Sequence, residues 1–241
     1  MNSPPLRRYR SGMTTATAND RSFFIVLALL MAMIVCIPIL NLIDPSPPGV
    51  LGSVLMTVFF SGVMLTSVHA VGHSHRVLII GFLLAVPAVA TKVAREFLTG
   101  DIITVTDHVS DIIFLAFIVV ELLRALFAAR AVTANLIACS MCTYLILALW
   151  FASVAGLLEC LVPGAYQVLT EVGDDVSIAS QAGDIAVYYS FITITTLGYG
   201  DIVPMIPASR MLAGVEAIVG QFYMAILVAR LVGMHLVSSA D

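Results

Sequence analysis

The stretch TITTLGYGDIVP, at residues 193–204, places two glycines, a tyrosine and an aspartate between two long apolar segments. Backbone without helical hydrogen bonds is costly in lipid, and it persists at membrane depth only where it is buried in protein or lines water. Glycine adopts left-handed backbone conformations at little steric cost. Gly198 and Gly200 therefore predict a segment that alternates between left- and right-handed conformations and turns its carbonyl groups to one side.

The composition around this stretch is that of a membrane protein. Of the 241 residues, 60% are hydrophobic and 11% are charged, and the mean hydropathy is +1.05. Soluble domains carry about 25% charged residues. The net charge is only −4, and no basic nucleic-acid-binding surface is recognisable, so we expect lipid and not nucleic acid around the chain. The expected location is the cell membrane, inner or plasma.

Six stretches are long enough to cross a bilayer, which takes about 20 apolar residues. A seventh, residues 185–195, is apolar but too short to span, and it fits a re-entrant helix. The predicted fold is therefore an all-α membrane protein. The six predicted spans are 23–43, 50–71, 77–97, 109–129, 133–158 and 209–232.

Basic residues orient the predicted bundle, because cytoplasmic loops are enriched in lysine and arginine. Arginines precede the first span and flank the turns after the second and fourth, whereas residues 159–184 contain acidic residues and no lysine or arginine. We therefore expect a multi-pass protein with both termini in the cytoplasm and the acidic loop outside. Lys92 and Arg95 depart from this pattern, and we expect their long side chains to extend to the outer interface.

The quoted stretch carries a family resemblance. The sequence TTLGYGD, at residues 195–201, resembles the signature of the tetrameric potassium channels, with Leu197 where valine is commonest. Upstream, YYSFITIT at residues 188–195 is similar to the pore helix of that family. Downstream, the last span resembles the family's inner helix, with Gly220 at the position of its flexible glycine. The resemblance is strong over roughly residues 133–232, and over the first four spans it is one of architecture.

The resemblance implies a homotetramer in which four filter strands stack rings of carbonyl oxygens that replace the water around K+. K+ is then the permeant ion, and no cofactor is expected. Tyr188 and Tyr189 are implied to brace Tyr199 from behind, and Gly220 to act as a gating hinge. Because Ile192 stands where some family members carry a carboxylate, Asp201 is expected to lack that partner. The implied ion-binding residues are Thr196, Leu197, Gly198, Tyr199 and Gly200, with K+ at the first four, and the implied supporting residues are Thr195, Asp201, Tyr188 and Tyr189.

The expected organisation is a voltage-sensor-like four-helix domain followed by a pore domain. A voltage sensor needs basic residues at every third position of its fourth helix, since each gating charge contributes about 2.3 kcal/mol per 100 mV. Span 109–129 and its flank offer only Arg124 and Arg130, so we expect weak or no intrinsic voltage dependence. The predicted parts are a cytoplasmic segment 1–22, the four-helix domain 23–130 and the pore domain 131–241, with outer helix 133–158, pore helix 185–195, filter 196–201 and inner helix 209–232.

Ionisable residues within the predicted spans are candidate sensors of pH or of the electric field. Glu121 and Arg124 have a spacing that lets them pair on one helix face. Asp111, with Arg95 and Glu96, suggests an ion-pair network, for which a role in helix packing is the favoured interpretation. Glu216 faces either the pore helix, in a hydrogen bond, or the central cavity. Two further patterns are better explained without a ligand: His69, His73 and His75 as a loop cluster, and Cys139 with Cys142 as packing residues.

Other functions remain open at this stage. A non-selective cation channel and a non-conducting accessory subunit that assembles with another channel both share the observed pattern. An enzyme is disfavoured, because no HExxH or GxSxG motif and no paired intramembrane aspartates occur. The sequence does not identify the gating stimulus, and a separate regulatory subunit is a further candidate partner.

Overall fold

The structure is a computed structural model, and it describes residues 22–43, 50–71, 75–98, 100–129, 131–169, 176–177 and 184–238. Helices dominate this part of the chain. The predicted N-terminal segment 1–22 lies outside the described residues except for Ser22. The helices are α1 (Ser22–Ile43), α2 (Val50–Val71), α3 (His75–Phe97), α4 (Asp101–Ala128), α5 (Ala134–Leu161), α6 (Asp184–Ile194) and α7 (Pro207–Ser238).

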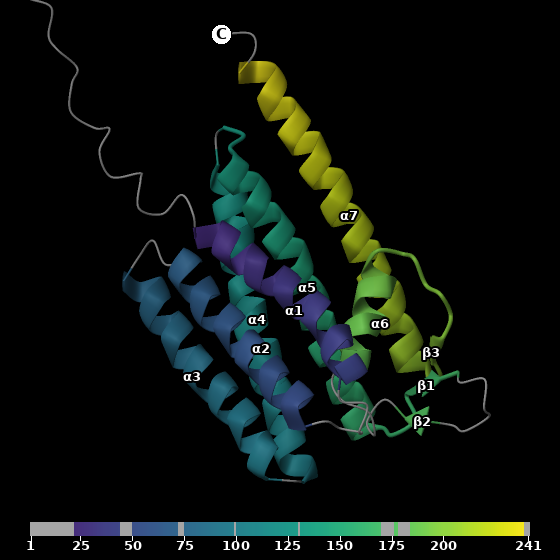
Figure 1. The fold of residues 1–241 in the computed structure, drawn as a ribbon. Helices are drawn as coiled ribbons and strands as arrows, with labels where there is room; N and C mark the ends of the chain where they lie inside the picture. Colours follow the sequence, from purple (N-terminus) through teal and green to yellow (C-terminus); the bar gives the residue numbers. More distant parts are fainter. Residues whose placement is uncertain are drawn as a thin grey trace, which may run out of the picture.

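The first four helices form a bundle that packs on α5 through α4 and α1 (Figure 1). Helix α5 then packs against both the short α6 and the long α7. A single apolar core runs through the bundle into α5, with Leu30 of α1, Met64 of α2, Phe114 of α4 and Ile146 of α5 among its fully buried members. Helix α3 lies on the far side of the bundle from α7 (Figure 1).

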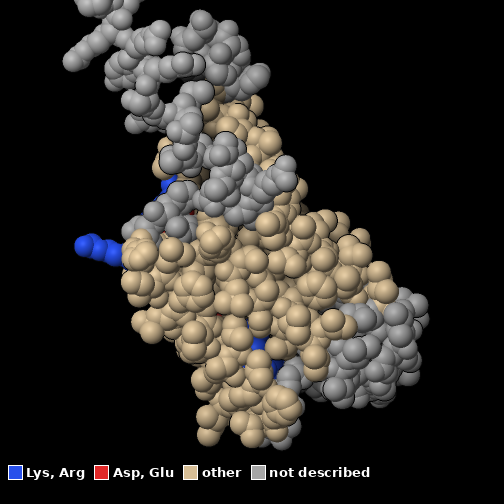
Figure 2. Space-filling view, turned by 60° about the vertical axis from the view of Figure 1, so that its left-hand side comes forward, with Lys and Arg blue, Asp and Glu red and all other residues tan. Residues whose placement is uncertain are grey.

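Among the residues that the structure describes, three helices are long and apolar enough to cross a membrane: His75–Arg95, Ala134–Leu161 and Pro207–Met234. They correspond to the third, fifth and sixth predicted spans. Ile185–Ile194 forms a shorter apolar helix within the predicted segment 185–195, and its re-entrant placement stays a prediction. Figure 2 shows a face of the molecule on which the described side chains are almost all uncharged. Such a surface is costly in water and favourable in lipid.

Helix α4 begins earlier than its apolar run suggested. It starts at Asp101, eight residues before the predicted Val109, and it has 28 residues. Asp101 lies in its first turn, where a carboxylate interacts favourably with the positive end of the helix dipole. Asp107 and Asp111 follow and are both buried. The prediction took the start of the apolar run as the start of the span, and the helix extends beyond that run.

Buried ion pairs join α3 to α4, and they correct the expectation for Lys92. Its ammonium nitrogen lies 2.5 Å from Asp111 Oδ2 and 3.6 Å from Asp107 Oδ2, so it does not extend to the outer interface. Arg95 Nη1 also turns to Asp107 Oδ2, at 2.9 Å. Carboxylates inside a protein require partners, and these bases provide them. The expected network is present, with the unpredicted Asp107 at its centre; the Glu96 side chain lies outside the described residues.

A small antiparallel sheet accompanies the helices, which agree with the predicted all-α fold. Strand β1 (Tyr166–Val168) pairs on one side with β2 (Val176–Ser177) and on the other with β3 (Ile202–Pro204). In the β1–β3 register, Val168 lies opposite Ile202, near the end of the quoted stretch. The sheet therefore joins the outer loop to the end of that stretch. Three-residue strands are too short to leave a recognisable alternation in the sequence.

Candidate functional site

The site is built on the backbone that leaves the end of α6. The amide of Thr196 donates to Thr193 O at 2.9 Å, and the amides of Leu197 and Gly198 both donate to Ile192 O, at 2.9 and 3.1 Å. The chain then leaves the helix in an open conformation. These bonds anchor its first residues to the last turn of α6.

Every second residue of this segment has a positive φ. The angle is 59° at Thr196, 50° at Gly198 and 80° at Gly200. A Cβ added at either glycine would meet no atom within 4 Å in this chain, so the backbone angle and not the space requires glycine there. The predicted alternation is thus present at both glycines. It extends to Thr196, where nothing in the sequence indicates it, because threonine rarely adopts such angles.

Asp201 closes the segment and has a partner from α6. Tyr188 Oη donates to Asp201 Oδ2 at 2.6 Å. The Asp201 carbonyl accepts the amide of Leu169 at 2.7 Å, which continues the contact with β1. A tyrosine hydroxyl therefore takes the place of the carboxylate partner that Asp201 was expected to lack.

Tyr189 points away from Asp201 and into a separate apolar cluster. Its ring packs edge-on against Tyr166 of β1, with the centroids 5.1 Å apart. Burial raises the pKa of the Tyr166 phenol, which keeps this ring neutral. Tyr199 itself is 69% exposed in one chain. The bracing of Tyr199 by the two tyrosines stays a prediction.

The inner end of the segment contacts α7 through Gln221, which the sequence analysis missed. Gln221 Nε2 donates to Thr196 Oγ1 at 3.2 Å, while the Thr196 hydroxyl donates to Thr195 O at 2.6 Å. The Thr195 hydroxyl turns back to Phe191 O, also at 2.6 Å. The sequence did offer one signal of this contact, because Gln221 is a polar residue in an apolar helix and directly follows Gly220.

Gly220 lies where α7 comes closest to the end of α6. A Cβ at this position would be 2.3 Å from Ile194 O, so only glycine fits. The same Ile194 carbonyl, one of those left without a helical partner at the end of α6, accepts the hydroxyl of Tyr144 at 3.0 Å. The structure thus provides a packing reason for Gly220, and its role as a hinge stays a prediction.

Glu216 faces α6, which is one of its two predicted orientations. It is 1% exposed and forms a hydrogen bond with Ser190, at the centre of that helix. Ser190 Oγ also lies 2.5 Å from Ala148 O of α5. Three helices therefore meet at one serine hydroxyl of α6, the helix that leads into the glycine-rich segment (residues 196–201).

Glu159, near the end of α5, is a second residue that sequence reasoning missed. Its Oε1 accepts the amide of Gly164 at 2.9 Å, and its Oε2 accepts the amide of Tyr166 at 3.0 Å. The carboxylate is buried and holds the turn that leads into β1. The signal for this role was an acidic residue shortly before the turn sequence Pro163–Gly164. The sequence analysis instead assigned Glu159 to the outer loop.

Residues 143–235 match the protein family described as ion channel. The match covers α6, the glycine-rich segment and nearly all of α7. We refer to residues 143–235, which carry this match, as the ion-channel domain. Together with the three apolar helices, this makes the chain a membrane protein. No curated protein matches the chain.

The other candidate sensors lie outside the ion-channel domain. Glu121 and Arg124 form the predicted pair on α4, where the Arg124 side chain is 69% exposed. Exposed pairs of this kind contribute about 0–1 kcal/mol. The structure does not bring this pair to the glycine-rich segment.

The histidine and cysteine patterns show no metal site. Within the residues that the structure describes, no group of three or more histidine, cysteine or acidic side chains is arranged to hold a metal ion. His69 and His75 are exposed, and His73 lies outside the described residues. Cys139 and Cys142 are free and buried in α5, which agrees with a packing role.

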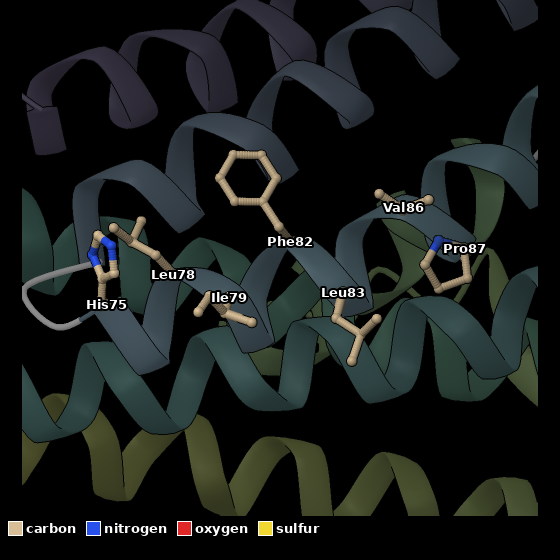
Figure 3. A pocket seen from close by; sticks show the side chains of 7 residues that line it. All are labelled: His75, Leu78, Ile79, Phe82, Leu83, Val86 and Pro87. Carbon is tan, nitrogen blue, oxygen red and sulfur yellow. The ribbon is translucent and has the colours of Figure 1, made fainter.

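An apolar hollow of about 630 Å³ lies along α3 (Figure 3). It is distant from the ion-channel domain, and in a bilayer a surface of this composition faces lipid. Its lining residues are His75, Leu78, Ile79, Phe82, Leu83, Val86 and Pro87.

Proposed function

We propose that this chain is the pore-forming subunit of a potassium-selective channel. The observation that carries the proposal is the positive φ at Thr196, Gly198 and Gly200 within an ion-channel domain. Alternation of left- and right-handed conformations turns successive carbonyl groups to one side of the strand. Such a row of oxygens replaces the hydration shell of a dehydrated cation. The ion-binding residues would be Thr196 to Gly200, with K+ as the permeant ion.

Four copies are proposed to surround one conduction path. A single strand offers carbonyls on one side of an ion only, whereas a dehydrated ion needs oxygens all around it. The side chains of Leu197 and Tyr199 are 55% and 69% exposed in one chain. Neighbouring subunits of a homotetramer would cover them. The exposed apolar side chains of α7, such as Val215 and Ile218, would also be covered by neighbouring subunits, or they would face lipid.

The orientation of α6 supports cation binding. Its C-terminal end leads into the filter, and the partial negative charge at that end of a helix favours a cation nearby. We further propose that the termini are cytoplasmic and that the acidic outer loop raises the cation concentration at the mouth. This places the protein in the cell membrane as a multi-pass channel.

Weak or absent voltage dependence follows from where the basic residues lie. Arg124 of α4 is exposed and already paired with Glu121. Lys92 and Arg95 lie on α3, where buried carboxylates of α4 hold them. Movement of these bases through the membrane field would require breaking buried ion pairs, which is strongly unfavourable.

The test is K+ flux from liposomes that contain the purified protein. Potassium-loaded liposomes in sodium buffer should take up protons when a protonophore is added, since K+ efflux sets up the driving potential. Gly200→Ala should abolish this flux, whereas the control Gly214→Ala, at an open helical position without positive φ, should retain it. Equal flux in both variants would contradict the proposal, and no flux from the purified wild type would favour a non-conducting accessory subunit.

A further inference from the structure

Behind the filter, one serine hydroxyl contacts two oxygen atoms from two other helices. Ser190 Oγ of α6 lies 2.5 Å from Ala148 O of α5 and forms a second hydrogen bond with Glu216 Oε1 of α7. Ser190 is 0% exposed, so water does not reach this contact from outside the chain. The proton positions at this junction can be deduced from the chemistry of the three groups.

A serine hydroxyl carries one proton, and a backbone carbonyl can only accept. If Ser190 donated its proton to Glu216, no hydrogen would lie between Ser190 Oγ and Ala148 O. Two oxygen lone pairs would then face each other at 2.5 Å, which is hydrogen-bond distance without a hydrogen bond. Both contacts are satisfied when Ser190 donates to Ala148 O and Glu216 donates to Ser190. This second arrangement requires Glu216 to be a carboxylic acid.

The surroundings of Glu216 agree with the acid form. Within the described residues, the titratable groups that interact electrostatically with Glu216 are phenols: Tyr144 of α5, Tyr189 of α6 and Tyr166 of β1. Tyrosines are neutral at pH 7 and bring no positive charge to balance a carboxylate. A buried charge without a partner is costly, so the group takes up a proton instead.

We propose that Glu216 acts in its protonated form as a positioning residue of the filter, through a relay from Glu216 to Ser190 to Ala148 O. This inference rests on the proposed channel function. One helical turn beyond Glu216, Gly220 lies against Ile194 O of α6. The relay and this close contact fix α7 along α6 at two successive points. The carbonyl of Ile192, which accepts the amides of Leu197 and Gly198, belongs to a residue between Ser190 and Ile194 in the chain.

The first test detects the proton directly and does not need conduction. Infrared spectra of the full-length protein in liposomes should show a carboxylic acid carbonyl band at neutral pH that shifts in D2O and is lost in Glu216→Gln. The matched control, Glu121→Gln, should leave that band, because Glu121 is paired with Arg124 as a carboxylate. Loss of a carboxylate band instead of an acid band in Glu216→Gln would overturn the proposal.

The second test separates positioning from simple packing. The amide of Glu216→Gln can still donate to Ser190, so this variant should keep K+ flux within about twofold of wild type. Glu216→Leu keeps the volume but loses the donor, and its flux should fall about tenfold or more. Wild-type flux should decline from neutral to alkaline pH as Glu216 loses its proton, whereas Glu216→Gln should not change.

Two results would contradict the relay: equal loss of flux in Glu216→Gln and Glu216→Leu, or identical pH profiles of wild type and Glu216→Gln. If the wild type carried no K+ flux at all, the channel function would fail while the infrared band still decided the state of Glu216. The two proposals therefore fail by different measurements.

Discussion

At the scale of single residues, the proposed filter depends on three backbone angles and a few side chains that hold them. Positive φ at Gly198 and Gly200 was predictable, because glycine is the residue that adopts such angles at little cost. Positive φ at Thr196 was not, since it is imposed by the bonds at the end of α6 and by Gln221. The local sequence predicts the intrinsic backbone preference of a residue. It does not reveal a hydrogen bond from a helix that is distant in the chain.

Gly200→Ala should disrupt the outer end of the filter. An L-residue in the left-handed region is destabilised by about 1–2 kcal/mol, and four copies would multiply that effect in one pore. We expect loss of K+ flux from liposomes while the protein still assembles, as measured by its mass in detergent. A conducting Gly200→Ala channel would mean that the φ of 80° is not needed for function.

Tyr188→Phe should loosen the filter without altering its backbone preference. The substitution removes only the hydroxyl that donates to Asp201 Oδ2 at 2.6 Å. A hydrogen bond to a charged group contributes about 1.5–3 kcal/mol when shielded and less when exposed. Sustained K+ current should therefore decay several-fold faster than in wild type, as recorded in planar bilayers. An unchanged decay would show that Asp201 is held by other contacts.

At the scale of elements, helices were predictable and their polar connections were not. The helix over Val50–Val71 was predicted with the same bounds, because a long apolar run between turn-forming residues marks both ends. Helix α4 begins eight residues before its predicted start, since Asp107, which precedes the apolar run, is held inside the protein by Arg95 and Thr91 of α3. Strands β1 and β3 pair across more than 30 residues of chain, and short-range periodicity does not report such pairing.

Glu159→Gln should release the β1 end of the sheet. The variant keeps one acceptor, so one of the amides of Gly164 and Tyr166 loses its buried partner. Such a loss destabilises by about 1–3 kcal/mol. Hydrogen exchange at Tyr166 should accelerate about tenfold or more. The control Glu121→Gln should leave this exchange rate unchanged, and an unchanged rate in Glu159→Gln would refute the role assigned to the carboxylate.

Lys92→Met should destabilise the bundle more than a paired replacement does. The single change leaves Asp111 buried without its base, which should lower the free energy of unfolding by about 3–5 kcal/mol. The double variant Lys92→Met/Asp111→Leu removes both charges and should recover most of that stability. Thermal unfolding in detergent measures the difference. Equal losses in the two variants would mean that the ion pair does not contribute as described.

At the scale of the whole molecule, a helical bundle without a gating-charge series adjoins an ion-channel domain. The match at residues 143–235 covers the part of the chain whose motif is local and specific. The first four helices have no comparable motif, and their likeness to a voltage-sensor domain stays a prediction. Four of their charged residues, Lys92, Arg95, Asp107 and Asp111, form a network of two bases and two acids between α3 and α4. This network favours a fixed bundle over a moving sensor.

The most direct measurement is the reversal potential of the purified protein in a planar bilayer with K+ on one side and Na+ on the other. The account predicts reversal close to the equilibrium potential of K+, with an open probability that does not change as the voltage is stepped. Reversal near zero would contradict potassium selectivity and direct attention to Leu197. Steep voltage dependence would contradict the fixed bundle and show that Lys92, Arg95 or Arg124 carries gating charge.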